Sequence, residues 1–206
     1  SYVNSSGFII DGPEYLTIFN GQTGAAMQTV DYDPGRGDTT TWGKTSDKTN
    51  RVDRFLACTA YLDGVHPSLV TARGYYGKAI VVAYDWDGKN LNKRWRCDST
   101  VSGYGSLAGQ GNHNVSVADL DGDGCDEIVY GSAAIDNDGT VAHSTGWGHG
   151  DAIHVSDFNN DGKQEIFGVL EEKPNWGTGF RDAAGKEIWH FKASGDDGRG
   201  VMDYFS

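Results

Sequence analysis

Cysteine is scarce in this chain of 206 residues, and the shortage excludes two classes of site. The three cysteines are Cys58, Cys97 and Cys125, and no Cys-x-x-Cys pair occurs. A zinc site of the usual spacing and a thioredoxin-type redox site are therefore excluded. We expect three thiols that are buried or lie in loops, with a single disulfide as the alternative.

Long hydrophobic runs and positive charge are also scarce. The longest apolar runs have five or six residues, as at 79–83, whereas a membrane-spanning helix needs about 20. Seventeen basic residues against 29 acidic residues give a net charge of −12, which would repel a nucleic-acid backbone or an anionic membrane surface. We therefore expect neither nucleic acid nor a membrane as a partner. Without an initiator methionine or a signal peptide, the chain is interpreted as a mature or excised piece.

Glycine is abundant, with 30 residues, and helical periodicity is hard to find. Short β-type runs alternate with tight polar turns that contain glycine, a pattern typical of β-hairpins. The predicted hairpins pair residues 16–19 with 25–30, 80–84 with 91–95, 133–135 with 140–143, and 179–181 with 187–191. A second type of strand pair encloses a longer loop, in which 115–118 pairs with 127–131, 153–156 with 165–169, and, in a degenerate copy, 56–64 with 68–74.

One strand pair of each type gives four strands in roughly 40–60 residues, which matches one blade of a β-propeller. The chain holds about three to four such units, whereas closed rings have about four to eight blades. The prediction is therefore an all-β fold, a partial β-propeller domain over residues 1–206 with the rest of the ring missing. Its exposed blade faces would favour contact with the remaining blades or self-association.

One of the longer loops follows a D-x-D-x-D-G-x-x-E pattern, and a second loop follows the same pattern with asparagine at position 3. Alternate residues of such a loop turn their oxygen atoms inward, the glycine lets the chain double back, and the carbonyl at position 7 can add a ligand. This oxygen-only set predicts a Ca²⁺ site in each loop, and a solvated acidic turn is the alternative. The predicted ligands are Asp119, Asp121, Asp123, Cys125 and Glu127 in the first loop, and Asp157, Asn159, Asp161, Lys163 and Glu165 in the second.

Neither loop is an EF-hand, because position 12 is Tyr130 or Gly168 instead of an acidic residue and the flanks have the pattern of strands. We expect both ions to be structural, since a cation cancels repulsion on the order of a few kcal/mol between packed carboxylates. Loops of this kind fit a habitat with millimolar calcium, so the sequence predicts a secreted, extracellular protein.

Polar residues collect just before the innermost strand of each predicted blade. His113 stands six residues before Asp119, and Asp151 stands six residues before Asp157. At the mouth of a central channel such residues would form a polar funnel, although a hydrogen-bonded turn histidine is the alternative for each histidine alone. The set comprises Asp53, Arg54, Asn112, His113, His149 and Asp151.

The segments that contain these residues resemble the polysaccharide lyase family 11 rhamnogalacturonan lyases, and the resemblance covers nearly the whole chain. The segments are GQGNHNVSVADLDGDG at 109–124, GHGDAIHV at 148–155, NRVDRFL at 50–56 and ARGYY at 72–76. The resemblance implies an eight-bladed propeller with several calcium ions, of which this chain would hold roughly three blades. It also implies cleavage of rhamnosyl-(1→4)-galacturonate bonds in plant cell-wall rhamnogalacturonan I by β-elimination.

The resemblance further implies a calcium ion in the central cleft, held by His113, His149, Asp151 and Glu171. Because Ca²⁺ prefers oxygen ligands, either imidazole could instead hold a water molecule or contact the substrate. In β-elimination a cation stabilises the enolate-like intermediate while a base removes the C5 proton. The candidate catalytic residues are His113, His149, Arg54 and Arg73, and the candidate substrate-binding residues are Asn112, Asp53 and Tyr75.

Other functions are also compatible with the residues. Asp151 and Glu171 could be an opposed carboxylate pair for hydrolysis, although the histidines favour elimination. A non-catalytic, calcium-stabilised propeller could serve as a scaffold or bind carbohydrate or protein. An inactive truncated lyase is a further alternative, because the family members are much longer and part of their substrate contacts lies in blades absent here. Catalysis is expected of the full-length lyase more than of these 206 residues alone.

Overall fold

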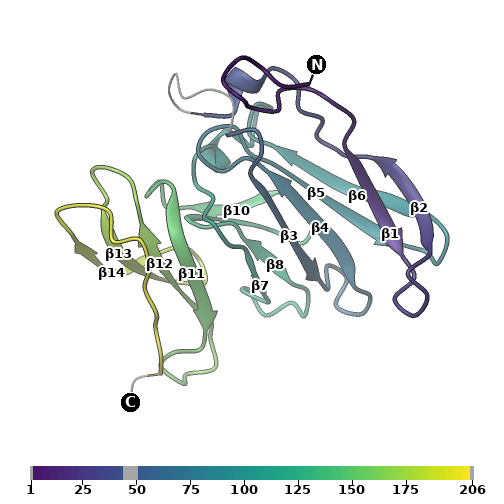
Figure 1. Ribbon diagram of the computed structural model, residues 1–206. Helices are drawn as coiled ribbons and strands as arrows, with labels where there is room; N and C mark the ends of the chain where they lie inside the picture. Colours follow the sequence, from purple (N-terminus) through teal and green to yellow (C-terminus); the bar gives the residue numbers. More distant parts are fainter. Residues whose placement is uncertain (1, 44–50, 205–206) are drawn as a thin grey trace.

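The protein is seen in a computed structural model that describes residues 2–43 and 51–204 (Figure 1). These residues form four antiparallel sheets and two short 3-10 turns, η1 (Thr39–Thr41) and η2 (Gly105–Leu107), without an α-helix. No helix in the described part is long and apolar enough to cross a membrane. The predicted all-β class is confirmed. Asn50, the first residue of the 50–56 segment, lies outside the described residues.

Three of the sheets are four-stranded meanders in which each strand pairs with the next one along the chain. The first sheet contains β3 (Phe55–Ala60), β4 (Ser68–Arg73), β5 (Ile80–Trp86) and β6 (Leu91–Asp98), the second β7 (Ser116–Ala118), β8 (Glu127–Val129), β9 (Ala133–Ile135) and β10 (Val141–Ser144), and the third β11 (Gly150–Ser156), β12 (Glu165–Leu170), β13 (Gly177–Asp182) and β14 (Glu187–Lys192). The two-stranded sheet pairs β1 (Tyr15–Phe19) with β2 (Ala26–Asp31). Every predicted strand pair is present, with ends shifted by a few residues.

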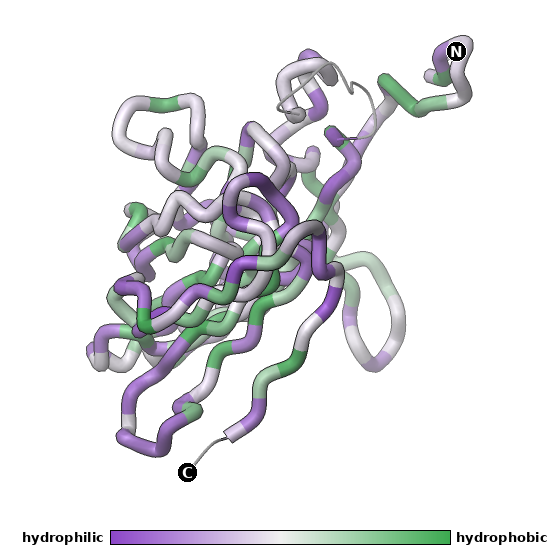
Figure 2. Tube along the Cα trace, turned by 90° about the vertical axis from the view of Figure 1, so that its left-hand side faces the viewer, coloured by the Kyte–Doolittle hydropathy of each residue, from purple (hydrophilic) through white to green (hydrophobic). Residues whose placement is uncertain are grey.

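Burial differs between the inner and the middle strands of each meander. The middle strands β8, β9 and β12 are buried at every residue, which explains why their sequences are nearly continuous apolar runs. Neighbouring sheets pack through these strands, because Val81 of the first sheet shares a core with Ile128 and Ile135 of the second. Val129 and Ile153 join the second sheet to the third. Hydrophobic segments of the chain alternate with hydrophilic turns in Figure 2.

The first strands of the meanders adjoin one another, since β7 contacts both β3 and β11 (Figure 1). An isolated parallel bridge between Asn112 and Gly150 ties the segment before β7 to the start of β11. The chain therefore brings the entrances of two sheets together, and the polar residues predicted from the sequence lie at these entrances.

The cysteines are free thiols, which agrees with the expectation of three buried or loop thiols and not with the alternative of a single disulfide. Cys97 is buried in the core between the first two sheets, and Cys58 packs against that core. Cys125 lies half-buried in the loop between β7 and β8.

Gly150→Ala is expected to destabilise the fold by about 1–3 kcal/mol, because there is no room for a side chain at the first residue of β11 and even a methyl group would overpack it. A Cβ atom at Gly150 would overlap the carbonyl oxygen of Val169 and stand 3.0 Å from Oδ1 of Asn112. The matched control is Gly21→Ala, where nothing lies within 4 Å of the new methyl group. Denaturant unfolding measures both variants, and equal stability of the two would contradict the close approach.

Candidate metal centre and acidic loops

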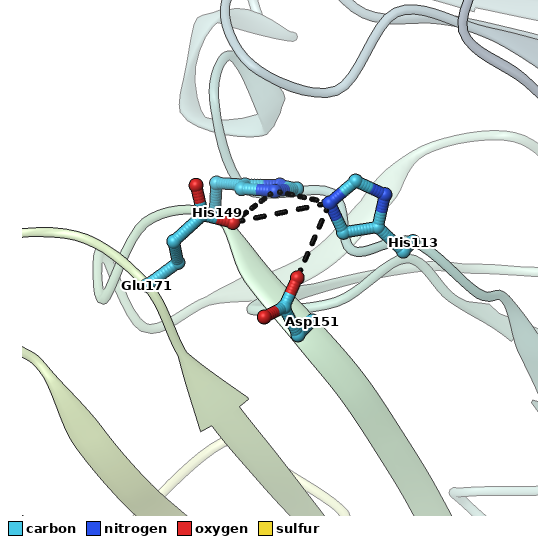
Figure 3. A group of neighbouring side chains, drawn as sticks. All are labelled: His113, His149, Asp151 and Glu171. Atoms are coloured by element: carbon cyan, nitrogen blue, oxygen red, sulfur yellow. Dashed lines mark hydrogen bonds and ion pairs between the residues drawn. The ribbon is translucent and has the colours of Figure 1, made fainter. Parts of the chain in front are cut away.

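Four side chains with cation-binding atoms converge at the entrances of β7 and β11 (Figure 3). They are His113, His149, Asp151 and Glu171, and one ligand atom of each lies within 4.8 Å of the others. Nε2 of His113 lies 3.2 Å from Oδ1 of Asp151 and 3.2 Å from Nε2 of His149. Nε2 of His149 lies 3.2 Å from Oε2 of Glu171. The structure thus brings together the four residues that the resemblance implies.

Backbone pairing sets the positions of these side chains. β11 and β12 pair with Gly150 opposite Leu170, so the residues one step outside the pair, His149 and Glu171, are neighbours. The N–H of Glu171 donates to the carbonyl of His149 at 3.1 Å, and the N–H of His113 donates to the carbonyl of Gly150 at 3.3 Å. Because the sheets hold the backbone at each position, the ligand atoms are preorganised.

His149 is held in the form that binds metals. Its side chain is fully buried, and Nδ1 hydrogen-bonds the carbonyl oxygen of Gly111. A carbonyl oxygen only accepts, so Nδ1 carries the proton and the lone pair of Nε2 faces Glu171. Burial lowers the pKa of His149 to about 4, which keeps the ring neutral at neutral pH. Burial, and then the charge of Glu171, raise the pKa of Asp151, as expected for carboxylates crowded without a counter-ion.

Two tyrosines pack around the histidines. The Tyr75 hydroxyl lies 3.0 Å from Nδ1 of His113, and its ring stacks on His149 with 5.2 Å between ring centres. The Tyr76 hydroxyl lies 3.3 Å from Nε2 of His113, and its ring centre lies 4.2 Å from that of His149. Burial raises the pKa of both phenols. Tyr75 is a predicted site residue, whereas Tyr76 is missing from the prediction although it closes the same ARGYY segment.

Arg73 has a different environment from the one that its predicted catalytic role requires. Its side chain is fully buried, and its guanidinium donates to both carboxylate oxygens of Glu14 at 2.6 and 2.7 Å. Further donor groups of Arg73 bind the carbonyls of Val52 and Pro34, each at 2.8 Å. A guanidinium enclosed in this way presents no surface to a polysaccharide. We therefore assign Arg73 to holding the end of β4 against the segments before β3.

The other predicted residues divide between structural and accessible positions. Asn112 is 1 % exposed and its Nδ2 donates to the carbonyl of Ala152 at 3.0 Å, so it links two strand entrances and does not face the cleft. Oδ1 of Asp53 accepts from Arg36 at 2.7 Å. Arg54 is half-buried, with its guanidinium carbon 6.0 Å from the centre of the Tyr76 ring. Arg54 thus lies near the four converging side chains, whereas Asn112 is buried and links the two strand entrances.

The first acidic loop has the donor set of a calcium site. Oxygen atoms of Asp119, Asp121 and Glu127 lie within 4.8 Å of one another. Glu127 is 2 % exposed, and its Oε1 is buried without a hydrogen-bond partner while Oε2 accepts from the N–H of Leu120 at 2.6 Å. A buried carboxylate oxygen without a donor is costly, and a hard divalent cation would remove this cost. Asp123 lies outside this group of three and accepts from the N–H of Cys125.

The second acidic loop gathers Asp157, Asp161 and Glu165, whose oxygens lie within 4.8 Å of one another, so position 5 of the loop belongs to this group and position 3 to the first. Nδ2 of Asn159 donates to Oε1 of Glu165 at 3.0 Å, while its Oδ1 accepts from the N–H of Asp161 at 2.9 Å. The N–H of Lys163 donates to Asp161. These carboxylates are the type of oxygen donor that Ca²⁺ prefers. Cys125 and Lys163 remain predicted ligands through their carbonyl oxygens.

We expect calcium-depleted protein to lose stability as the pH rises from about 4.5 to about 7. Burial, with help from Asp121 and Asp136, raises the pKa of Glu127 from 4.5 to about 7. The fold therefore favours protonated Glu127, a contribution of up to about 3 kcal/mol that is complete below pH 4.5 and lost above pH 7. Denaturant unfolding at pH 5 and pH 8 in calcium-free buffer measures the loss. Glu127→Gln should reduce it, and an unchanged loss in this variant would contradict the assignment to Glu127.

The chain matches the family model described as rhamnogalacturonan lyase family 11, C-terminal domain, over residues 1–205. Two proteins of Bacillus subtilis (strain 168) are similar to it. The rhamnogalacturonan exolyase YesX is 54 % identical over 202 residues, and the rhamnogalacturonan endolyase YesW is 50 % identical over 204 residues. These matches cover 96 % and 97 % of this chain but 32 % of each relative. The chain thus spans about one third of the length of the curated relatives it matches.

Solved structures agree with the fold described above. The crystal structure of YesW superposes with a TM-score of 0.91 at 50 % identity, over 97 % of this chain and 34 % of that one. A Bacillus licheniformis rhamnogalacturonan lyase superposes equally well, with a TM-score of 0.91 at 52 % identity, over 98 % of this chain and 35 % of that one. The four sheets are therefore an arrangement that occurs within longer proteins.

Proposed function

This chain belongs to rhamnogalacturonan lyase family 11, and from that membership we propose that it supplies the cation-binding wall of a secreted lyase that cleaves rhamnosyl-(1→4)-galacturonate bonds of rhamnogalacturonan I by β-elimination. The observation that carries the proposal is the convergence of His113, His149, Asp151 and Glu171 on one point. Their neutral imidazole and carboxylate groups suit a divalent cation, for which we propose Ca²⁺. Two further calcium ions in the acidic loops would have structural roles.

We propose that the three meanders are blades of a larger ring. Two features support this arrangement: each meander has four strands in chain order, and β7 contacts both β3 and β11. Up to two thirds of a full-length relative lies outside the matched region, enough for further blades. The remaining blades would cover the sheets at both ends and contribute the rest of the cleft. Assays of the proposal therefore use the full-length protein, meaning this chain within a complete family 11 lyase.

The residues around the centre have distinct parts in the proposed reaction. A cation bound there would stabilise the negative charge that develops beside the galacturonate carboxylate when the C5 proton leaves. His113 and His149 would hold it through Nε2, and the Tyr75 hydroxyl contacts Nδ1 of His113 and so orients its ring. Asp151 and Glu171 would complete the set of ligands. Placing the cation at the end of paired strands would fix its position relative to the polymer.

The proton acceptor is expected outside the described residues. Neither histidine can accept a proton at an Nε2 that binds a cation, and burial raises the pKa of both Tyr75 and Tyr76, which favours the neutral phenol. Arginine keeps its proton in proteins, so Arg54 is better suited to bind an anion than to accept a proton. We therefore propose that the base lies in the other two thirds of the lyase.

The test is incubation of the full-length protein with rhamnogalacturonan I, with and without calcium. β-Elimination leaves a C4–C5 double bond in the new uronate end, so ultraviolet absorbance should rise together with the number of chain ends, and only when calcium is present. New chain ends without absorbance would indicate hydrolysis, and binding without new ends would indicate the scaffold or binding-module alternative. Either outcome would remove the lyase proposal.

A further inference from the structure

Arg54 differs from several other arginines of the chain because it has no ion-pair partner among the described residues. Arg36, Arg73, Arg94 and Arg96 each form an ion pair with an aspartate or glutamate. Arg54 forms none with any residue in 2–43 and 51–204: its Nη1 lies 3.5 Å from the carbonyl of Asp53, and its Nε is buried without a hydrogen-bond partner. Within the same ranges Arg181 and Arg199 also form no ion pair, and Arg54 differs from both because its backbone is tied to the turn that carries Tyr75 and Tyr76. Arg54 is suited to an anion that comes from outside.

The backbone holds Arg54 beside the metal centre. The N–H of Gly74 donates to the carbonyl of Arg54 at 2.8 Å, and Nε of Arg73 donates to the carbonyl of Val52 at 2.8 Å. The segment before β3 is therefore tied to the turn after β4, which carries Tyr75 and Tyr76. Arg54 is a principal positive charge acting on the Tyr75 hydroxyl, which itself contacts His113.

Tyr76 lies next to positive groups as well as the histidines. The guanidinium carbon of Arg51 lies 3.7 Å from the centre of the Tyr76 ring, a cation–π contact, and the ring centre of His149 lies 4.2 Å from the same point. The guanidinium carbon of Arg54 lies 6.0 Å from the centre of the Tyr76 ring, and the Tyr76 hydroxyl lies 3.3 Å from Nε2 of His113. Tyr76 therefore adjoins both Arg54 and the centre.

We infer that Arg54 binds the carboxylate of a galacturonate two units along the polymer from the reacting one; this rests on the proposed function. The backbone of rhamnogalacturonan I alternates neutral rhamnose with anionic galacturonate, so a chain whose reacting carboxylate faces the cation presents further carboxylates at regular spacing. A guanidinium binds a carboxylate through two parallel N–H···O bonds, which fixes the register of the polymer as well as adding affinity. Arg54 is accordingly a specificity-determining residue outside the cation site.

The direct test compares binding of two oligosaccharides to the calcium-loaded full-length protein by calorimetry: a rhamnogalacturonan I oligosaccharide and the same compound with its carboxyl groups reduced. Arg54→Gln should weaken binding of the native compound about 10-fold or more and leave binding of the reduced compound unchanged. Arg54→Lys should lose part of this affinity, since it keeps the charge without the paired donors. The matched control is Arg94→Gln, whose arginine pairs with Asp85 on the first sheet. Equal affinity of wild type and Arg54→Gln for the native compound would overturn the inference.

Kinetics separate this inference from the proposed function. If the full-length protein is a lyase, Arg54→Gln should raise KM about 10-fold while kcat changes by less than about threefold, because the contact is the same in ground and transition states. A fall in kcat at unchanged KM would instead place Arg54 in the chemical step and overturn the inference. If the wild type has no lyase activity, the calorimetric difference between native and reduced oligosaccharide still tests Arg54. Should Arg54→Gln fail to fold, the Arg54→Lys variant takes its place, and affinity equal to wild type would again overturn the inference.

Discussion

Replacing His149 by alanine in the full-length protein is expected to lower the rate of formation of unsaturated product by about 10²–10³-fold. The side chain is fully buried, its Nδ1 is held by the Gly111 carbonyl, and its Nε2 faces Glu171. Its loss removes one of four converging ligands, and Lewis-acid stabilisation of developing charge contributes several kcal/mol. The absorbance assay measures the rate, and a count of bound calcium should fall by one ion while the two loop ions remain.

Two further variants control this experiment. His66→Ala removes a histidine whose side chain is 79 % exposed and which contacts Asp63 in the degenerate loop, so the rate should stay at the wild-type level. His113→Gln removes a second ligand from a position that is 32 % exposed and leaves a smaller packing defect if the alanine variant is unstable. Wild-type rates in folded His149→Ala and His113→Gln would show that the centre has no part in catalysis.

Removal of calcium is expected to lower the free energy of unfolding by about 8 kcal/mol. At a free calcium concentration 100 times the dissociation constant, each site stabilises the fold by about 2.7 kcal/mol, and three sites are proposed, the centre and the two acidic loops. The ion-free loops also hold crowded carboxylates, with Oε1 of Glu127 buried and without a donor. Denaturant unfolding with and without a chelator measures the difference.

Single-loop variants assign the effect. Asp119→Ala and Asp157→Ala should each remove about a third of the calcium-dependent stabilisation, since each disables one of the three proposed sites. Asp11→Asn changes the same charge at an exposed position outside the loops and should keep the full calcium effect. A calcium effect of undiminished size in both loop variants would mean that the acidic turns are only solvated.

Features set within a few residues could be predicted well. The D-x-D-x-D-G-x-x-E spacing is a local pattern, and the structure gathers Asp119, Asp121 and Glu127 as that pattern requires. Hairpin strands such as β9 and β10 followed from an Asx-and-glycine turn between β-type runs. Asp123 was expected in the same group and lies outside it, whereas Asp161 at the same position of the second loop lies inside its group, although both carboxylates accept from the N–H two residues further on.

Contacts between distant segments were less predictable. Arg73 stood in a polar context in the sequence, but Glu14, 59 positions away, encloses its guanidinium. Asn112 was expected to contact substrate, whereas the Asn112–Gly150 bridge buries it between two strand entrances. Tyr76 contacts His113 across 37 positions, and nothing in the order of residues marks it above Tyr75. These partners depend on how sheets pack and not on local spacing.

The residues in order were sufficient for the class of fold, the strand pairs and the donor sets of the two acidic loops, because turn geometry and alternating burial act over a few neighbouring positions. The meeting of His113 with His149, the enclosure of Arg73 and the unneutralised charge of Arg54 arise from the assembled sheets. Those arrangements depend on side-by-side strands and on burial, which join segments that are dozens of positions apart and leave no periodic trace along the chain.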